Sequence, residues 1–222
     1  MARKSATRSE PRIPLSKERV LRAALTLVDE RGLEALSMRK LAQELGVEAM
    51  SLYNHVDNKD DIVASILELV ANEIDSPSAG GDWKTAVRRS AISAHEAFSR
   101  HPWAARIWMS SPRISDDGMR HADAVLRCLR DAGFSKDLTY HAYHVLQGYA
   151  LGFTLQELNF PYEREELKQL AAKFLREFPA ADYPYLAEHI EQHMEPSDDH
   201  QGAFEFGLDL VLDGLERLRD AG

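Results

Sequence analysis

Cysteine is almost absent from this chain, which carries a single one, Cys128, among its 222 residues. No disulfide can form within the chain, and a lone thiol of this kind is expected to be buried and inert. The sequence also has no run of roughly 20 apolar residues, the length that a membrane-spanning helix requires. Because no apolar run follows the polar N-terminus, a secretory signal is not expected. These absences predict a globular cytoplasmic protein with no membrane partner.

Catalytic signatures are missing as well, so an enzyme is not expected. The sequence contains no glycine-rich phosphate loop, no nucleophile elbow and no HExxH motif. His189 and His193 are four residues apart, and His141 and His144 are three apart, spacings at which one helix face can hold a metal ion. An exposed acidic helix is the favoured interpretation around His189, and a helical metal-dependent enzyme is a remote alternative. No cofactor and no bound metal are predicted.

Strand-like alternation of apolar and polar residues is not sustained anywhere, whereas apolar residues recur at helical spacing through most of the chain. The stretch from Ser37 to Lys59 predicts two short helices joined by a sharp turn. Ser37 can cap the first helix, and Gly46 suits the left-handed residue that ends it. The second helix would bury Leu52 and Val56 and expose small, aromatic and hydrogen-bonding groups. Such a helix-turn-helix suits the edges of base pairs and the phosphates beside them.

The motifs LAQELGV and SLYNHV, followed by Asn58 and Lys59, resemble the DNA-binding segment of the tetracycline-repressor (TetR) family of bacterial transcriptional regulators. A second segment near the C-terminus, AFEFGLDLVLDGLERL, resembles the last helix of the tetracycline-binding members, which helps to form their dimer. The resemblance implies a homodimeric, ligand-responsive transcriptional repressor. It implies an all-α fold with an N-terminal three-helix helix-turn-helix DNA-binding domain and a larger helical ligand-binding and dimerisation domain.

Residues 1–14 are expected to form a flexible basic arm, residues 15–60 the DNA-binding domain, and residues 61–222 the helical effector-binding and dimerisation domain. A helix over residues 58–75 would connect the last two. Residues 1–60 carry 11 Lys and Arg and 9 Asp and Glu, whereas residues 61–222 carry 16 and 27. This division would orient the mildly basic end toward DNA. For the arm, with its cations at positions 3, 4, 8 and 12, a DNA contact and a solvated tail both remain open.

Eight residues of the helix-turn-helix and its flanks are the candidates for DNA contact. The guanidinium of Arg39 matches the O6 and N7 atoms of guanine, and the family motif also places a base contact there. Tyr53, His55 and Lys59 are assigned to phosphates, and the remaining candidates to bases or phosphates. The tetracycline-binding members have a bulky aromatic at the position of Asn54, so their operator sequence is not inherited. The full set is Arg39, Ala49, Met50, Ser51, Tyr53, Asn54, His55 and Lys59.

The larger domain contains an unusual collection of aromatic and polar side chains, which predicts an effector pocket between helices. The alternative is that aromatic residues at helical spacing are packed core. In the tetracycline-binding members the drug is held with magnesium on histidines, whose places Asp75 and Trp108 take here. A hydrophobic or aromatic effector is therefore expected instead. The candidates for effector contact are Trp103, Trp108, Met109, Tyr140, Tyr143, His144, Gln147 and Phe153.

Two long apolar helices, residues 136–159 and the helix from Ala203 onward, can pair with their counterparts in a second chain as a four-helix bundle. Gly207 and Gly214 would permit close approach. Periodicity alone does not separate this interpretation from an internal core, and the family resemblance favours the homodimer. The expected partners are therefore a near-palindromic DNA operator, a small-molecule effector and a second copy. A DNA-binding regulator without a small ligand, controlled by a protein partner, is the main alternative.

Overall fold

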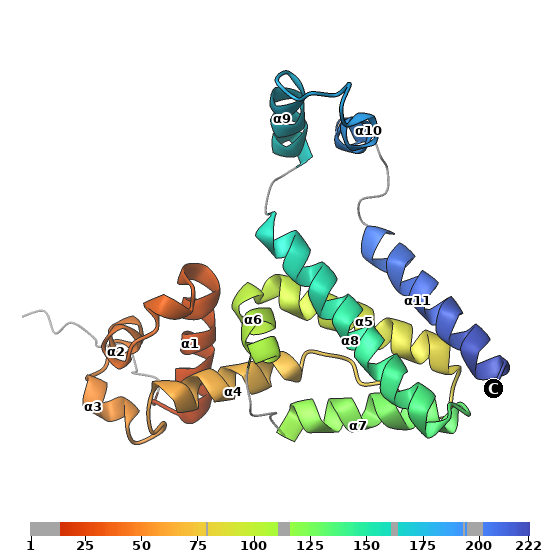
Figure 1. Ribbon diagram of the computed structural model, residues 1–222. Helices are drawn as coiled ribbons and strands as arrows, with labels where there is room; N and C mark the ends of the chain where they lie inside the picture. Colours follow the sequence, from red (N-terminus) through yellow and green to blue (C-terminus); the bar gives the residue numbers. More distant parts are fainter. Residues whose placement is uncertain (1–13, 79, 111–115, 161–163, 193, 195–201) are drawn as a thin grey trace, which may run out of the picture. The chain divides into compact units, whose positions relative to one another are not determined.

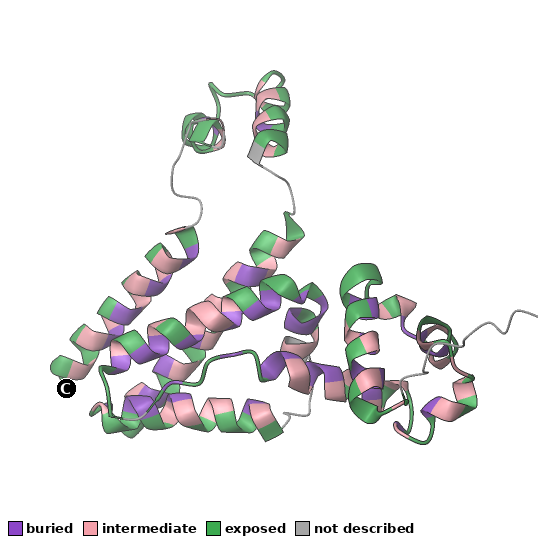
Figure 2. Cartoon of the chain, turned by 180° about the vertical axis from the view of Figure 1, so that it is seen from behind, coloured by how far each residue is buried: buried purple, intermediate pink, exposed green. Residues whose placement is uncertain are grey.

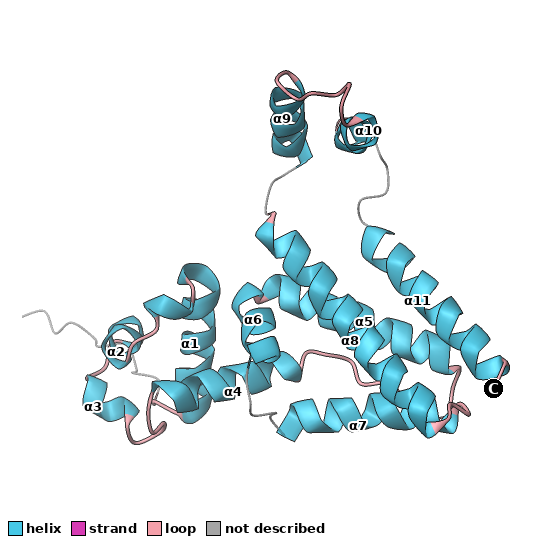
Figure 3. Cartoon of the chain, in the orientation of Figure 1, coloured by secondary structure: helices cyan, strands magenta, loops and turns pink. Residues whose placement is uncertain are grey.

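The computed structural model describes residues 14–78, 80–110, 116–160, 164–192, 194 and 202–222. Every regular element within these ranges is a helix (Figures 1 and 3), which confirms the all-α fold. Among the helices of the described ranges, none is both long enough and apolar enough to cross a bilayer. The chain divides into two compact units, Met1–Asn72 and Glu73–Gly222.

The first unit is a small helical bundle in which α1 packs against α2 and α4. Ser16, Ser37 and Asn58 cap its longer helices, because each side-chain oxygen accepts the amide hydrogen of the residue three positions on. Leu52 and Ile62 are fully buried in its core. Its elements are α1 (Lys17–Arg31), the 3-10 turn η1 (Leu33–Ala35), α2 (Met38–Leu45), α3 (Ala49–Leu52) and α4 (Lys59–Ala71).

The connecting helix is shorter than the sequence predicts. It was expected over residues 58–75, but α4 ends at Ala71, and the residues from Glu73 to Ser76 are not helical. Their polar groups bond to Ser93 and His121 instead of continuing the helix. The division between the units also falls after Asn72 rather than after residue 60, because α4 packs against α1.

The second unit has α8 at its centre, with α5, α6, α7 and α11 packed against it. Buried residues of α5, α7, α8 and α11 form one hydrophobic cluster that includes Trp83, Leu129 and Leu208, together with Phe134 between α7 and α8. Figure 2 shows buried residues along each of these helices. Cys128 is buried in this cluster, as predicted. The helices are α5 (Trp83–Arg100), α6 (Pro102–Ser110), α7 (Asp116–Asp131), α8 (Lys136–Asn159), α9 (Arg164–Leu175), α10 (Pro184–Gln192) and α11 (Ala203–Asp220).

Asp82 and Ser135 cap the starts of α5 and α8, because their side-chain oxygens accept the amide hydrogens of Thr85 and Leu138. The segment after α8 holds two helices, α9 and α10, which pack against each other.

Ion pairs between side chains of α5 and α11 link these two helices. The Lys84 ammonium lies 2.6 Å from Asp213 and 2.7 Å from Glu216, and the Arg88 guanidinium lies 2.7 Å from Asp209. Hydrogen bonds to Asp213 and Glu216 raise the pKa of Lys84 to about 12. The first two turns of α5 and the middle turns of α11 are therefore held in a fixed register.

Candidate nucleic-acid interface and ligand pocket

The turn between α2 and α3 is set by a glycine in the left-handed conformation. Gly46 ends α2 with φ 66° and ψ 34°, angles that a side chain disfavours. The Gly46 amide donates to the Gln43 carbonyl at 3.2 Å, and the Val47 amide donates to the Ala42 carbonyl at 3.0 Å. These bonds close the end of α2 and redirect the chain into α3, as the sequence predicts.

The short helix α3 presents its outer side to solvent and anchors its inner side in the core. Leu52 is fully buried and Val56 is 3% exposed. Met50, Tyr53 and Asn54 are exposed, with Met50 at 73%. The helix itself ends at Leu52, so residues 53–55 lie in the turn that follows it rather than in a longer recognition helix.

The other DNA candidates surround this turn. Arg39 is exposed on α2, and Ala49, Ser51 and His55 are partly exposed. Lys59 is the first residue of α4 and is partly exposed. All eight candidates belong to the first unit and none is buried, so a phosphate or a base edge can reach each of them. Contact with DNA stays a prediction for all eight, and the cations of the N-terminal arm lie outside the described residues.

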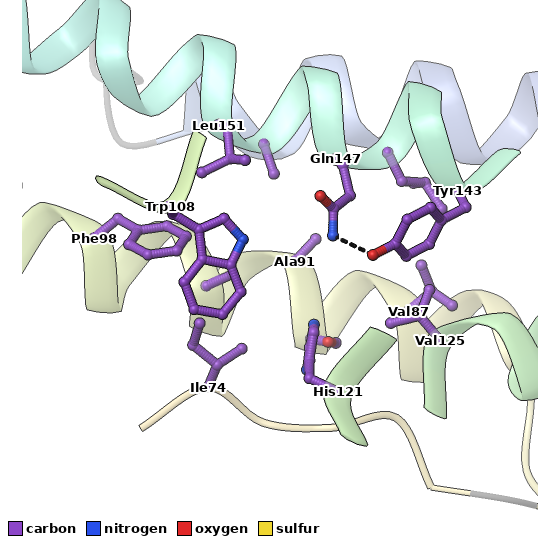
Figure 4. A pocket seen from close by; sticks show the side chains of 14 residues that line it. Ile74, Val87, Ala91, Phe98, Trp108, His121, Val125, Tyr143, Gln147 and Leu151 are labelled. Atoms are coloured by element: carbon purple, nitrogen blue, oxygen red, sulfur yellow. Dashed lines mark hydrogen bonds between the residues drawn. The ribbon is translucent and has the colours of Figure 1, made fainter. Parts of the chain in front are cut away.

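A pocket lies in the second unit among α5, α6, α7, α8 and the segment that follows α4 (Figure 4). Its volume is about 60 Å³, and most of its lining is apolar. Phe98 and Trp108 meet edge to face at one end, with ring centroids 5.5 Å apart. The lining residues are Ile74, Val87, Ser90, Ala91, Ala94, Phe98, Trp108, His121, Val125, Tyr143, Leu146, Gln147, Ala150 and Leu151.

Polar groups are few in this pocket and lie mainly on α7 and α8. The Gln147 side-chain amide donates to the Tyr143 hydroxyl at 2.8 Å. Burial raises the pKa of Tyr143, although this hydrogen bond opposes it, so the phenol stays protonated. Burial also lowers the pKa of His121, which favours the neutral imidazole. None of the described lining residues is a Lys, Arg, Asp or Glu, so the pocket offers dipoles and no fixed charge.

The structure brings three of the eight predicted effector residues to this pocket: Trp108, Tyr143 and Gln147. Four others, Trp103, Tyr140, His144 and Phe153, do not line it. Met109 belongs to α6, but its side chain lies outside the described residues. Contact with an effector stays a prediction for each residue of the set.

Helix geometry explains why those four side chains lie elsewhere. Tyr140 and His144 are exposed on a face of α8 that does not line the pocket. Phe153 packs against Tyr149 and Phe204, on the side of α8 toward α11, and Trp103 is 8% exposed in α6. The sequence interpretation grouped aromatic residues from several faces because periodicity does not say which neighbour a face meets.

Most of the lining was missed by sequence reasoning. The small residues Ser90, Ala91 and Ala94 of α5 leave the space that the pocket occupies, and their spacing on one helix face was a usable signal. Ile74 was taken for the end of the connecting helix. His121 had no neighbouring motif that marked it as a lining residue.

Comparison with known proteins identifies the class of protein that this fold and these sites define. The model of the bacterial regulatory proteins of the tetR family matches residues 20–66. The model of the tetracyclin repressor-like C-terminal domain matches residues 76–219. The chain belongs to the TetR family of helix-turn-helix DNA-binding transcriptional regulators.

Several named relatives extend along most of the chain. The HTH-type transcriptional repressor DrrR1 of Streptomyces coeruleorubidus is 33% identical over 94% of this chain and 80% of its own length. The class D tetracycline repressor of Escherichia coli is 32% identical, over 91% of this chain and 89% of its own. The solved structure of ActR of Streptomyces coelicolor with actinorhodin is 29% identical, covers 93% of this chain and 99% of its own, and superimposes with a TM-score of 0.74.

Proposed function

We propose that the protein is a transcriptional repressor that binds a near-palindromic operator as a homodimer and leaves it when a small hydrophobic or aromatic effector occupies the pocket. The observation that supports DNA binding is the helix-turn-helix. Its second helix is anchored by Leu52 and exposes Met50, and the turn that follows exposes Tyr53 and Asn54. Each protomer would place one such head in the major groove, with half-sites about 34–36 Å apart or a multiple of that distance.

The chemistry of the pocket supports an uncharged effector with fused or linked aromatic rings. Trp108 and Phe98 offer ring faces and edges, and the Tyr143 and Gln147 pair offers hydrogen bonds to a carbonyl or hydroxyl group. A charged ligand would lose its hydration without gaining an ion pair. Two similar proteins have been solved with ligands bound: ActR of Streptomyces coelicolor with actinorhodin, and a variant of TetR from Acinetobacter baumannii with minocycline.

The described lining residues do not fit a magnesium ion of the kind that accompanies tetracycline. Magnesium requires carboxylate, carbonyl or water oxygens in octahedral geometry. The lining offers one imidazole, His121, and one side-chain carbonyl, that of Gln147, but no carboxylate. Asp75 is exposed next to Ile74 and lies 3.6 Å from Arg89. A metal-independent effector therefore fits better than a magnesium chelate.

The test measures DNA binding and effector release together. DNA selected from a random pool by the purified protein is labelled, and fluorescence anisotropy follows binding across salt concentrations and a panel of uncharged aromatic compounds. Specific binding that weakens with salt and is reversed by one compound is the expected result.

Two substitutions test the assigned DNA contacts. Arg39→Ala should reduce the binding free energy by about 1–3 kcal/mol, mainly through discrimination at one base pair, and Lys59→Gln should weaken binding to all DNA sequences equally. DNA binding that survives both changes would contradict the assignment of the helix-turn-helix residues as the DNA contacts.

The small size of the pocket favours a second candidate function, a DNA-binding regulator that is controlled by a protein partner. About 60 Å³ is far below the roughly 300–1,000 Å³ of a pocket that encloses a drug-sized ligand. An effector must therefore enlarge the pocket as it enters. Specific DNA binding that no compound of the panel reverses would favour this second candidate.

A further inference from the structure

The segment Glu73–Ser76, here called the strap, joins the end of α4 to the second unit and is tied to α5 by one serine. The Ser93 hydroxyl accepts the Asp75 amide hydrogen at 2.9 Å and donates to the Glu73 carbonyl at 3.3 Å. Both residues that flank Ile74 are thus held by the same side chain. Because the strap is not helical, these bonds replace the backbone bonds that a continued helix would have made.

The ends of the strap are tied by side chains. The Glu73 carboxylate accepts hydrogen bonds from Arg100, at 2.7 and 3.3 Å, and lies 3.2 Å from Nε2 of His101. Burial raises the pKa of Glu73, but these two partners outweigh it and leave the pKa below its ordinary value. At the other end, Ser76 Oγ lies 3.4 Å from Nδ1 of His121.

Between these ties, Ile74 forms part of the pocket wall. Its side chain is 7% exposed, and Figure 4 shows it pointing from the strap toward the Trp108 ring. His121, which faces Ser76, lines the same pocket. A molecule that enlarges this small pocket on the side of Ile74 and His121 therefore presses on a residue of the strap or on a group that holds it.

We propose that the strap is the positioning element through which occupation of the pocket reaches the DNA-binding unit. Displacement of Ile74 breaks the Ser93 bridge and frees Glu73, which follows directly on Asn72, the residue that ends α4. This inference rests on the proposed function. The strap would couple the pocket to the DNA-binding unit through two states, one with the Ser93 bridge formed and one with it broken. The hydrogen bonds of this bridge lie near the surface, so they open at modest cost.

The test fills the pocket by mutation, so that no effector has to be known. Ala150→Phe adds a ring from α8, and Ala91→Leu adds a smaller group from α5 if the first variant does not fold. Hydrogen exchange of the strap amides is measured by mass spectrometry in the full-length protein. Filling the pocket should speed exchange of the Asp75 amide about tenfold and weaken binding to the selected operator by about the same factor.

The bridge is then removed by Ser93→Ala, with Ser99→Ala, an exposed serine of the same helix, as the matched control. In the Ser93→Ala background, filling the pocket should change operator affinity by less than about threefold. In the Ser99→Ala background, it should weaken operator affinity by the same factor of about ten as in the otherwise unaltered protein. Equal effects in both backgrounds, or a weakened operator complex with unchanged strap exchange, would overturn the inference. If the unaltered protein binds no DNA, the proposed function fails, while the exchange experiment still decides whether the pocket opens the strap.

Discussion

Glu73 makes a pH-dependent contribution to stability whose sign follows from its partners. Its pKa lies below the ordinary 4.5, so its contribution is complete above that value and is lost as the pH falls through the lower, folded pKa. Glu73→Gln should therefore reduce the free energy of unfolding at pH 7, and the difference should shrink below about pH 4.5. Urea denaturation at several pH values measures it.

The matched control for this change is Glu96→Gln, an exposed residue of α5. It should have little effect at either pH, because an exposed carboxylate in high dielectric contributes little. If Glu73→Gln reduces the free energy of unfolding by the same amount from pH 7 to pH 3.5, the charge of the carboxylate is not what holds the strap.

Gly207 was expected to let helices of two chains approach, but the structure gives it a role inside one protomer. A methyl group at this position would overlap the ring and hydroxyl of Tyr149, which donates to the Phe204 carbonyl at 2.7 Å. Gly207→Ala should therefore destabilise the protein by about 1–3 kcal/mol in chemical denaturation, because the packed ring must move.

Removing the ring separates this explanation from an effect of helix propensity. In a Tyr149→Leu background, Gly207→Ala should cost much less, because the three atoms nearest to the added methyl group all belong to the Tyr149 side chain. An alanine is otherwise favoured over glycine inside a helix. The same loss in both backgrounds would rule out the clash with Tyr149.

Among the helices, the turn after α2 gives the clearest prediction. Gly46→Ala puts a side chain at φ 66° and should destabilise the first unit by about 1 kcal/mol, because left-handed angles crowd Cβ against the carbonyl. Operator affinity should fall with it, since the turn sets the angle between α2 and α3. Gly46→Asn is the control and should lose less, because asparagine tolerates this conformation. A Gly46→Ala variant as stable as the unaltered protein would contradict the argument.

Helix boundaries were predictable from sequence where a single local interaction decides them. Ser37 caps α2 and Gly46 ends it as expected, because capping and left-handed turns depend on residues a few positions apart. The end of α4 was missed because it is decided by Ser93, whose hydroxyl binds the strap from 18 positions along the chain. No local pattern records a bond of that kind.

The candidate sites divide in the same way. The DNA candidates cluster in one local motif, and each is accessible in the structure. The pocket depends on which faces of α5, α7 and α8 meet, so Tyr143 and Gln147 were found while His121 and Ile74 were not. Burial of an aromatic residue and lining of a cavity look alike at helical spacing.

For the whole molecule, the outer faces of α8 and α11 are where we expect a second copy to bind. Phe206, Leu210 and Leu218 recur every four or eight residues along α11 and are 69%, 58% and 59% exposed. Tyr140 and Val145 are exposed on α8, which packs beside α11. A lone protomer would leave this apolar surface in water, and a two-fold dimer would bury it as a four-helix bundle.

Leu210→Glu should therefore break the dimer, because a two-fold axis brings two copies of any residue near it into the same interface and desolvates both carboxylates. Sedimentation should then give the 25.0 kDa of one chain, and operator affinity should fall by roughly 10²-fold or more, because one head can no longer help the other to bind. Met119→Glu is the control, since Met119 is 50% exposed on α7, away from this surface. It should leave both the mass and the affinity unchanged.

Two results would contradict this prediction. A Leu210→Glu variant that sediments as a dimer would show that the interface lies on other helices. A monomer that keeps full operator affinity would show that the two DNA-binding units bind DNA independently.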